Sequence, residues 1–350
     1  MNIKANMERL FEIDLKDYKD TDKVFRRPSA RAIIIQDDKI ALVYSKKEKY
    51  YKFPGGGIHD DEDKKEALIR EVREEVGMIV IPESIREFGS VLRRQKSDLS
   101  ENTIFEQENY YYFCDVKDHI TSQELDDYEK EAGFVLRIVD IDTAITANDI
   151  YTSDISFDEI MIKRELRVLK MIKQELKKNQ FKIKTERMIL VPLGIKYLET
   201  VNEYALDYEN TKYMCHLPNE SSEETAEFLK NIDKEWEKDK PEFYELAMIY
   251  QGKHIGAVCV YFDGEEGELG WILNKKYWGN GFAVEAAKAL IDYSKEHLAI
   301  YHYIAHCDGE NVASFKTMEK LGMVKTEEKS GRKNRVADKE SIDYKYELNL

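Results

Sequence analysis

Three glutamates, Glu71, Glu74 and Glu75, lie close together within residues 56–78, which read GGIHDDEDKKEALIREVREEVGM. At spacings of i, i+3 and i+4 their side chains share one face of a helix, where like charges repel one another. Carboxylate oxygens are the ligands that Mg²⁺ and Mn²⁺ prefer, so the pattern predicts a divalent metal site. The alternative is a solvated acidic helix face. Arg70 can reach Glu74 at i+4 and is expected to hold that carboxylate in place.

The same segment resembles the Nudix box at all of its fixed positions. These are Gly56, five residues, Glu62, seven residues, Arg70-Glu71-Val72, one residue, Glu74-Glu75, one residue and Gly77-Met78. The resemblance implies a metal-dependent pyrophosphohydrolase that splits a nucleoside diphosphate linked to another group, by attack of water on phosphorus. It implies Glu71, Glu74 and Glu75 as metal ligands, with Glu62 as an auxiliary ligand or base and Arg70 and Glu74 in the catalytic set. A Nudix fold that senses a nucleotide without turnover is the alternative.

Length and charge limit the possible functions. A chain of 350 residues with 42% hydrophobic residues suggests two domains or more with ordinary cores. A formal net charge of −15 argues against general nucleic-acid binding, because no broad basic face is available to neutralise phosphates. Small phosphorylated ligands stay possible, since a bound cation or a few local basic residues can reverse the local field.

The cysteines and the N-terminus predict a cytoplasmic protein without a membrane segment. The four cysteines, Cys114, Cys215, Cys259 and Cys307, lie far apart and lack metal-ligand spacing, so they are expected to be reduced thiols. The first residues include acids and no apolar stretch typical of a signal peptide. No apolar run approaches the roughly 18 residues that span a bilayer.

The first half alternates strand and helix patterns, which predicts an α/β/α sandwich in a domain over residues 1–180, with its core at about 28–178. Residues 1–27 read as a lead-in strand and loops, and the charged stretch 95–108 reads as a flexible loop. Glu106 and Glu108 in this stretch are either an extra ligand or base, or plain loop acids. The expected strands cover 30–36, 39–45, 78–81, 85–93, 109–116 and 134–139, and the expected helices cover about 61–77 and 158–178.

The pattern restarts near residue 181 and predicts a second domain over 181–350. Helices are expected at 195–210, 222–238, from 282 onward and at 315–321, and strands at 182–193, 245–250, 253–262, 267–273, 301–306 and 342–348. Gln251-Gly252 and Asp263-Gly264 have the chemistry of hairpin turns. The charged tail 325–340 reads as a loop.

A glycine-rich turn, WGNGFA at residues 278–283, separates a strand from a helix. Backbone amides at such a helix N-terminus suit a pyrophosphate. The segments TERMILVPL, WGNGFAVEA and NVASFKTMEKLGM resemble, in order and spacing, the GNAT N-acetyltransferases, in the branch that includes ribosomal-protein N-terminal acetyltransferases. The resemblance covers about 183–350 and implies a mixed-sheet α/β fold.

This resemblance also implies that acetyl-CoA, the co-substrate, lies at the splayed end of the 267–273 strand. The pyrophosphate would lie on the 278–283 amides and the pantetheine near Asn311. The implied cofactor-binding residues are Leu273, Trp278, Gly279, Asn280, Gly281, Phe282, Ala283 and Asn311. Trp278 departs from the family, because a glutamine or arginine commonly opens this turn.

Acetyl transfer needs a base, because only a neutral amine attacks the acetyl carbonyl. Glu268, at the start of the cofactor strand, is the candidate base, with an ordinary strand carboxylate as the alternative. Many family members place a tyrosine acid where this chain has Met318. Ser314 is therefore the candidate that protonates the departing CoA thiolate, with a plain helix-start hydroxyl as the alternative.

Together these features predict a bifunctional enzyme. A Nudix hydrolase with Mg²⁺ or Mn²⁺ would act on a nucleotide-type small molecule, and an acetyl-CoA-dependent N-acetyltransferase would act on an amine, either a peptide N-terminus or a small molecule. The competing readings are a nucleotide-sensing module that regulates the transferase, and an acetyl-CoA-binding domain that transfers nothing.

Overall fold

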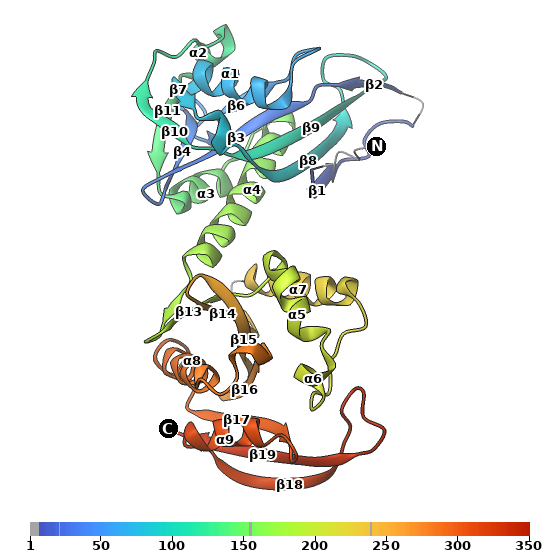
Figure 1. Ribbon diagram of the computed structural model, residues 1–350. Coiled ribbons are helices and arrows are strands. Elements are labelled where there is room, and N and C mark those ends of the chain that lie inside the picture. Colours follow the sequence, from blue (N-terminus) through green and yellow to red (C-terminus); the bar gives the residue numbers. More distant parts are fainter. Residues whose placement is uncertain (1–6, 21, 154–155, 239) are drawn as a thin grey trace. The chain divides into compact units, whose positions relative to one another are not determined.

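The computed structural model describes residues 7–20, 22–153, 156–238 and 240–350, without the side chains of 118–120, 156 and 157. The chain divides into two compact units, Met1–Lys173 and Gln174–Leu350 (Figure 1). The division falls within helix α4 (Ser156–Gln180). The domain boundary placed after residue 180 stays a prediction, and the expectation for residues 1–6 lies outside the described residues.

The first unit is built on a nine-stranded sheet. The central order is β1 (Arg9–Asp14), β8 (Arg86–Lys96), β9 (Thr103–Phe113), β3 (Ser29–Gln36), β4 (Lys39–Ser45) and β11 (Phe134–Val139). The short strands β2 (Lys23–Arg26), β5 (Tyr51–Lys52) and β6 (Gly55–Gly57) pair with β9, β4 and β3. A separate pair joins β7 (Met78–Val80) to β10 (Val116–Ile120). The helical elements are α1 (Lys64–Val76), η1 (Pro82–Ser84), α2 (Asp127–Ala132), α3 (Ile141–Asp149) and α4.

Helices α1 and α4 cover opposite faces of this sheet, as the alternation of β9 shows. Tyr112 belongs to the apolar cluster that contains Leu68 and Val72 of α1. Its neighbour Tyr111 points the other way and donates a hydrogen bond to Glu165 of α4. Successive residues of a strand face opposite sides, so the α/β/α sandwich expected from the sequence is confirmed.

The stretch 95–108 is largely strand, and its reading as a flexible loop is wrong. Strand β8 runs to Lys96 and β9 begins at Thr103, which leaves a short connection. Both arms carry charged residues that pair with one another across the strands, such as Arg94 with Glu106 at 2.6 Å. Charged cross-strand pairs stabilise a sheet without the apolar alternation that sequence patterns detect. Glu106 and Glu108 are therefore strand residues, and Glu108 pairs with Arg9.

The second unit is an eight-stranded sheet with helices on both sides. Its strand order is β12 (Ile183–Lys184), β13 (Met188–Pro192), β14 (Phe243–Tyr250), β15 (Lys253–Asp263), β16 (Glu266–Leu273), β17 (His302–Asp308), β19 (Ser341–Asn349) and β18 (Val324–Arg332). Its helical elements are η2 (Ile195–Tyr197), α5 (Leu198–Ala205), α6 (Tyr208–Thr211), α7 (Ser222–Trp236), η3 (Lys275–Tyr277), α8 (Phe282–Leu298) and α9 (Val312–Lys320). Figure 1 shows α8 on one side of β14–β16, with α5 and α7 on the other.

Two expectations for this unit need correction. The tail 325–340 contains strand β18, which pairs antiparallel with β19. Residues 324–331 of β18 are exposed, because it is an edge strand, so its charged residues conceal the strand in the sequence. The helix expected over 195–210 is interrupted and forms η2, α5 and α6. Helix α9 begins at Val312, before the expected start at Phe315.

Other expectations hold. Gln251 and Gly252 join β14 to β15 with φ of 49° and 75°, as a tight hairpin turn requires. The four cysteines are free thiols. Within the described residues, no helix combines the length and apolar character needed to cross a membrane.

Candidate active sites

Helix α1 positions the acidic cluster of the first unit. It begins after Asp63, whose side chain forms a capping box with Glu66, and ends at Gly77, which has φ of 71°. Its apolar face is buried against the sheet, so the opposite polar face is fixed in direction. The turn before it approaches closely: a Cβ added to Gly56 would lie 2.3 Å from a carboxylate oxygen of Glu71. Only glycine leaves room for that carboxylate.

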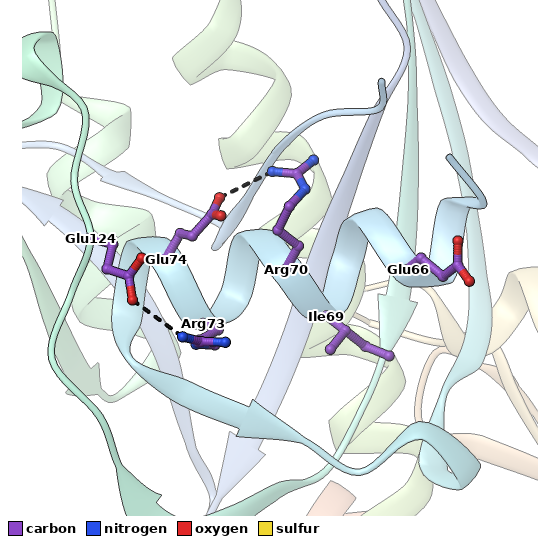
Figure 2. A pocket seen from close by; sticks show the side chains of 6 residues that line it. All are labelled: Glu66, Ile69, Arg70, Arg73, Glu74 and Glu124. Atoms are coloured by element: carbon purple, nitrogen blue, oxygen red, sulfur yellow. Dashed lines mark hydrogen bonds and ion pairs between the residues drawn. The ribbon is translucent and has the colours of Figure 1, made fainter. Parts of the chain in front are cut away.

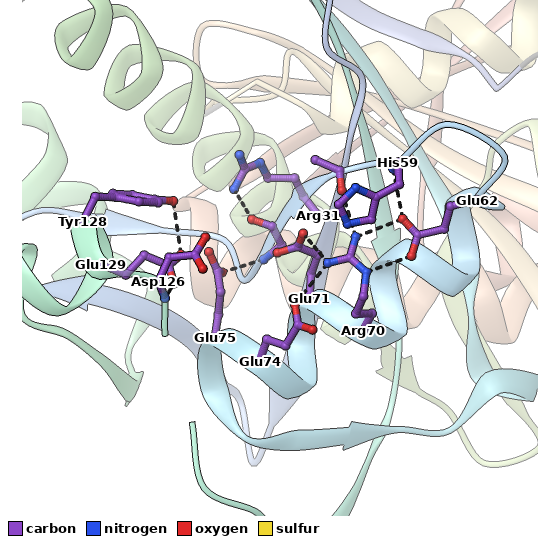
Figure 3. A network of polar contacts seen from close by, with 12 residues as sticks. Arg31, His59, Glu62, Arg70, Glu71, Glu74, Glu75, Asp126, Tyr128 and Glu129 are labelled. Carbon is purple, nitrogen blue, oxygen red and sulfur yellow. Dashed lines mark hydrogen bonds and ion pairs between the residues drawn. The ribbon is translucent and has the colours of Figure 1, made fainter. Parts of the chain in front are cut away.

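Arg70 connects three of the predicted site residues (Figure 3). Its Nε and Nη2 donate to both oxygens of Glu62, at 2.8 and 2.9 Å. Its Nη1 donates to Glu71 at 2.7 Å and to Glu74 at 3.0 Å, so the expected i+4 contact is present. Nη2 also donates to the carbonyl of Gly57 in the glycine turn, at 2.9 Å. One guanidinium thereby fixes three carboxylates and the turn.

The carboxylates of this cluster differ in their pKa. The hydrogen bonds from Arg70 lower the pKa of Glu62 to about 2, so Glu62 stays ionised. Burial raises the pKa of Glu71, although Arg70 opposes the shift. Hydrogen bonding to a charged form favours it and burial disfavours it. Glu62 therefore has the contacts of an anchor for Arg70, since both of its oxygens accept hydrogen bonds from the guanidinium.

Glu75 lies apart from the Arg70 network. Its carboxylate is buried, with one oxygen 2.6 Å from Nζ of Lys52 and the other 2.8 Å from the backbone N of Gly55. Glu129 of α2 also faces Lys52, with an oxygen 3.9 Å from Nζ. Sequence reasoning missed both Lys52 and Glu129, because they lie outside the box. The lysine before FPGGG carries only a weak clue, since it interrupts an aromatic, buried strand end.

The chemistry of these donors fits a hard divalent cation. Glu71 and Glu74 both accept hydrogen bonds from Nη1 of Arg70. Their oxygens therefore already meet around one positively charged group, as they would around a cation. The described residues contain no preformed group of three or more metal-ligating side chains. An open hollow lies beside Arg70 and Glu74 (Figure 2), and Glu66, Ile69, Arg73 and Glu124 complete its lining.

In the second unit, strands β16 and β17 pair only over their first residues. The parallel register runs from Glu266↔His302 to Glu268↔Ile304, although β16 continues to Leu273. The strands therefore part immediately after Glu268. The splayed strand end expected from the sequence is present, and the exposed side chain of Glu268 lies at the point of separation.

The turn before α8 leaves backbone amides accessible. Gly279 and Gly281 have φ of 77° and 78°, a conformation that favours glycine. A Cβ on Gly279 would meet nothing within 4 Å, and no described side chain caps α8. The indole of Trp278 donates to the carbonyl of Leu273 at 2.8 Å and ties the turn to β16. Asn280 donates to the carbonyls of Tyr277 and Trp278, while Phe282 and Ala283 begin α8.

The remaining predicted residues lie at the start of α9. Asn311 caps this helix, with Oδ1 accepting from the backbone N of Ser314 at 3.2 Å. The hydroxyl of Ser314 acts on the thiol of Cys307 on β17 and lowers the pKa of that thiol, although burial outweighs this effect. Burial raises the pKa of Cys307 to about 11, which keeps this thiol protonated at neutral pH.

Glu245 is a buried acid that sequence reasoning missed. It lies on β14, opposite Cys259 in register, and accepts a hydrogen bond from the hydroxyl of Tyr261 at 2.9 Å. Burial raises its pKa to about 7. The sequence offered one indication of this burial: Glu245 opens the apolar run ELAMIY. Strand alternation puts it on the same face of the sheet as the apolar Ala247.

Comparison with known proteins identifies both halves. A NUDIX domain matches residues 25–153, and an acetyltransferase (GNAT) domain matches residues 187–324. The uncharacterized N-acetyltransferase YnaD of Bacillus subtilis is 30% identical over 143 residues, which are 40% of this chain and 81% of that protein.

Solved structures resemble the second half. A GNAT-family acetyltransferase from Bacillus anthracis is 27% identical and covers 48% of this chain and 98% of its own, with a TM-score of 0.42. An acetyltransferase from Salmonella typhimurium, described as modifying the N-terminal serine of ribosomal protein L7/L12, is 12% identical, covers 49% and 99%, and has a TM-score of 0.43. The chain belongs to the GNAT acetyltransferases through its second half and carries a NUDIX domain in its first.

Proposed function

We propose that the chain is a bifunctional enzyme: a metal-dependent hydrolase of nucleoside diphosphates linked to another group, and an acetyl-CoA-dependent N-acetyltransferase. The observation that carries the hydrolase proposal is the Arg70 network, which orients Glu71 and Glu74 on one face of α1. A structural helix has no need to hold several carboxylates together around a buried turn.

Glu71, Glu74 and Glu75 would hold Mg²⁺ or Mn²⁺. A cation bound there would lower the pKa of its bound water and neutralise charge on the diphosphate. The protein's own contribution is orientation: Arg70 fixes two carboxylates and Gly57, and Glu62 fixes Arg70.

For the transferase, the separation of β16 from β17 after Glu268 and the amides of residues 278–283 support acetyl-CoA binding, together with Leu273 and Asn311. Glu268 takes a proton from the acceptor ammonium, and the neutral nitrogen then attacks the acetyl carbonyl. The C–S bond breaks as the new C–N bond forms, Ser314 gives a proton to the leaving thiolate, and the second proton released by the nitrogen restores the Ser314 hydroxyl. The acceptor is an amine, either a peptide N-terminus or a small molecule.

One observation favours a second candidate for the first unit. Lys52 occupies one oxygen of Glu75, and the described residues hold no preformed metal group. A nucleotide-sensing module that regulates the transferase would be consistent with this arrangement. Turnover separates the two candidates, since a sensor binds a nucleotide and releases no product.

The hydrolase test is a panel of nucleoside triphosphates, nucleotide sugars and dinucleoside polyphosphates with Mg²⁺ or Mn²⁺, comparing wild type with Glu74→Gln. Turnover that the substitution abolishes supports the hydrolase. Tight binding of one nucleotide without product favours the sensor. The transferase test follows labelled acetyl groups from acetyl-CoA to peptides, polyamines and aminoglycosides, and transfer to none of them contradicts that half of the proposal.

A further inference from the structure

Lys52 is a buried cation inside the acidic cluster of the first unit. It ends strand β5, and its side chain is 5% exposed. Its ammonium lies 2.6 Å from an oxygen of Glu75 and 4.4 Å from the centre of the Phe134 ring. Buried lysines lose hydration, so such a group depends strongly on its carboxylate partner.

Both oxygens of Glu75 are occupied. Oε1 faces Lys52, and Oε2 accepts from the backbone N of Gly55 at 2.8 Å. The Gly55 donor is a neutral backbone N–H, whereas the Lys52 contact brings a full positive charge. A divalent cation that uses Glu75 must therefore compete with Lys52, because both carry positive charge to the same carboxylate.

A second carboxylate lies within reach of the displaced lysine. Glu129 has an oxygen 3.9 Å from Nζ of Lys52. Helix α2 fixes that carboxylate, because it accepts from the hydroxyl of Tyr128 at 3.1 Å and from the backbone N of Asp126 at 2.8 Å. A small movement of the ammonium exchanges Glu75 for Glu129 without leaving the charge unpaired.

We propose that Lys52 competes with the metal for Glu75. Lys52 holds this carboxylate in the metal-free protein, and its ammonium moves to Glu129 when a divalent cation binds. The inference rests on the proposed metal-dependent function of the same site. It makes Lys52 a positioning residue that sets the metal concentration at which the site fills.

The test measures binding of Mn²⁺ to the full chain, with electron paramagnetic resonance reporting the concentration of free Mn²⁺. Lys52→Met is expected to bind Mn²⁺ at least about tenfold more tightly than wild type, on the scale typical of residues that contact metal ligands. Lys47→Met is the matched control, because Lys47 pairs with Glu131 at the exposed surface of the same unit, 3.1 Å away. Equal or weaker binding by folded Lys52→Met overturns the inference.

A second arm covers the case in which Lys52→Met does not fold without metal. Glu129→Gln removes the receiving carboxylate and is expected to weaken Mn²⁺ binding, and unchanged or tighter binding overturns the inference. Where Lys52→Met folds, adding Glu129→Gln to it is expected to have little further effect, because Glu129 then has no ammonium to receive. A full additive loss in the double variant also overturns it.

Glu74→Gln separates this inference from the proposed function. If wild type and Glu74→Gln bind Mn²⁺ equally, the cation is not at this cluster and the metal-dependent function fails with the inference. If binding depends on Glu74 and is the same in wild type and Lys52→Met, the inference alone fails.

Discussion

Arg70 and Glu62 form a bidentate ion pair, with Nε and Nη2 of the guanidinium 2.8 and 2.9 Å from the two carboxylate oxygens. The planar guanidinium matches a carboxylate in this geometry, and an ammonium cannot reproduce it. The pair leaves Nη1 free to hold Glu71 and Glu74. The orientation of the acidic face of α1 thus depends on a residue at the start of the box.

Arg70→Lys is expected to lower the rate of nucleotide hydrolysis by about a hundredfold or more, because lysine cannot bridge three carboxylates and small displacements of catalytic groups are costly. Steady-state kinetics on the best panel substrate would measure this. Arg86→Lys is the control, since Arg86 lies at the exposed start of β8 with its guanidinium 5.3 Å from the centre of the Phe113 ring, outside the Arg70 network. Equal losses in both variants would refute a special role for Arg70.

Glu75→Gln and Glu74→Gln are expected to differ in their effect on the stability of the first unit. Without metal, Glu75→Gln removes the closest anion of Lys52 and leaves its ammonium to Glu129, so it should lower the free energy of unfolding by roughly 1.5–3 kcal/mol. The Glu74 carboxylate is 37% exposed, so Glu74→Gln should change it by less than about 1 kcal/mol. Urea unfolding in EDTA, followed by circular dichroism, tests this, and similar losses would count against the buried ion pair.

Glu268→Gln is expected to reduce kcat for acetyl transfer by roughly 10²–10⁴, with little change in the KM for acetyl-CoA, because a general base acts on the amine. Glu265→Gln is the matched control, since Glu265 is exposed in the adjacent turn. Unchanged kcat in Glu268→Gln would make Glu268 an ordinary strand carboxylate and leave the base to another group.

The sequence predicts the local elements well where chemistry and periodicity agree. The box helix, its end at Gly77 and the Gln251-Gly252 hairpin follow from caps, apolar spacing and turn residues. The first part of β9 and the whole of β18 were not predicted, because charged cross-strand pairs and an exposed edge remove the alternation that identifies a strand.

In the candidate sites, contacts within one helix could be predicted from the sequence, and contacts between distant segments could not. The contact of Arg70 with Glu74 follows from helical spacing alone. The contacts of Lys52 with Glu75 and Glu129 join residues far apart in the chain, and only the folded sheet brings them together. Glu245 shows a further limit, since a single acid in an apolar strand does not reveal whether it is buried alone or paired with a cation.

Glu245 is expected to make the second unit less stable as pH rises. Burial raises its pKa to about 7, from an ordinary value of 4.5, so between these values the folded state binds more protons than the unfolded state. The free energy of unfolding therefore falls through this window, and the full penalty is present above pH 7. Glu245→Gln removes the charge and keeps an acceptor for Tyr261.

The stability of Glu245→Gln relative to wild type should accordingly increase by up to about 3 kcal/mol between pH 4.5 and pH 8. Urea unfolding of both proteins across this range measures the difference. Glu129, whose pKa burial also raises to about 7, is present in both proteins and cancels in the comparison. Parallel pH profiles would mean that the Glu245 carboxyl titrates alike in the folded and unfolded chains, so its burial would carry no electrostatic cost.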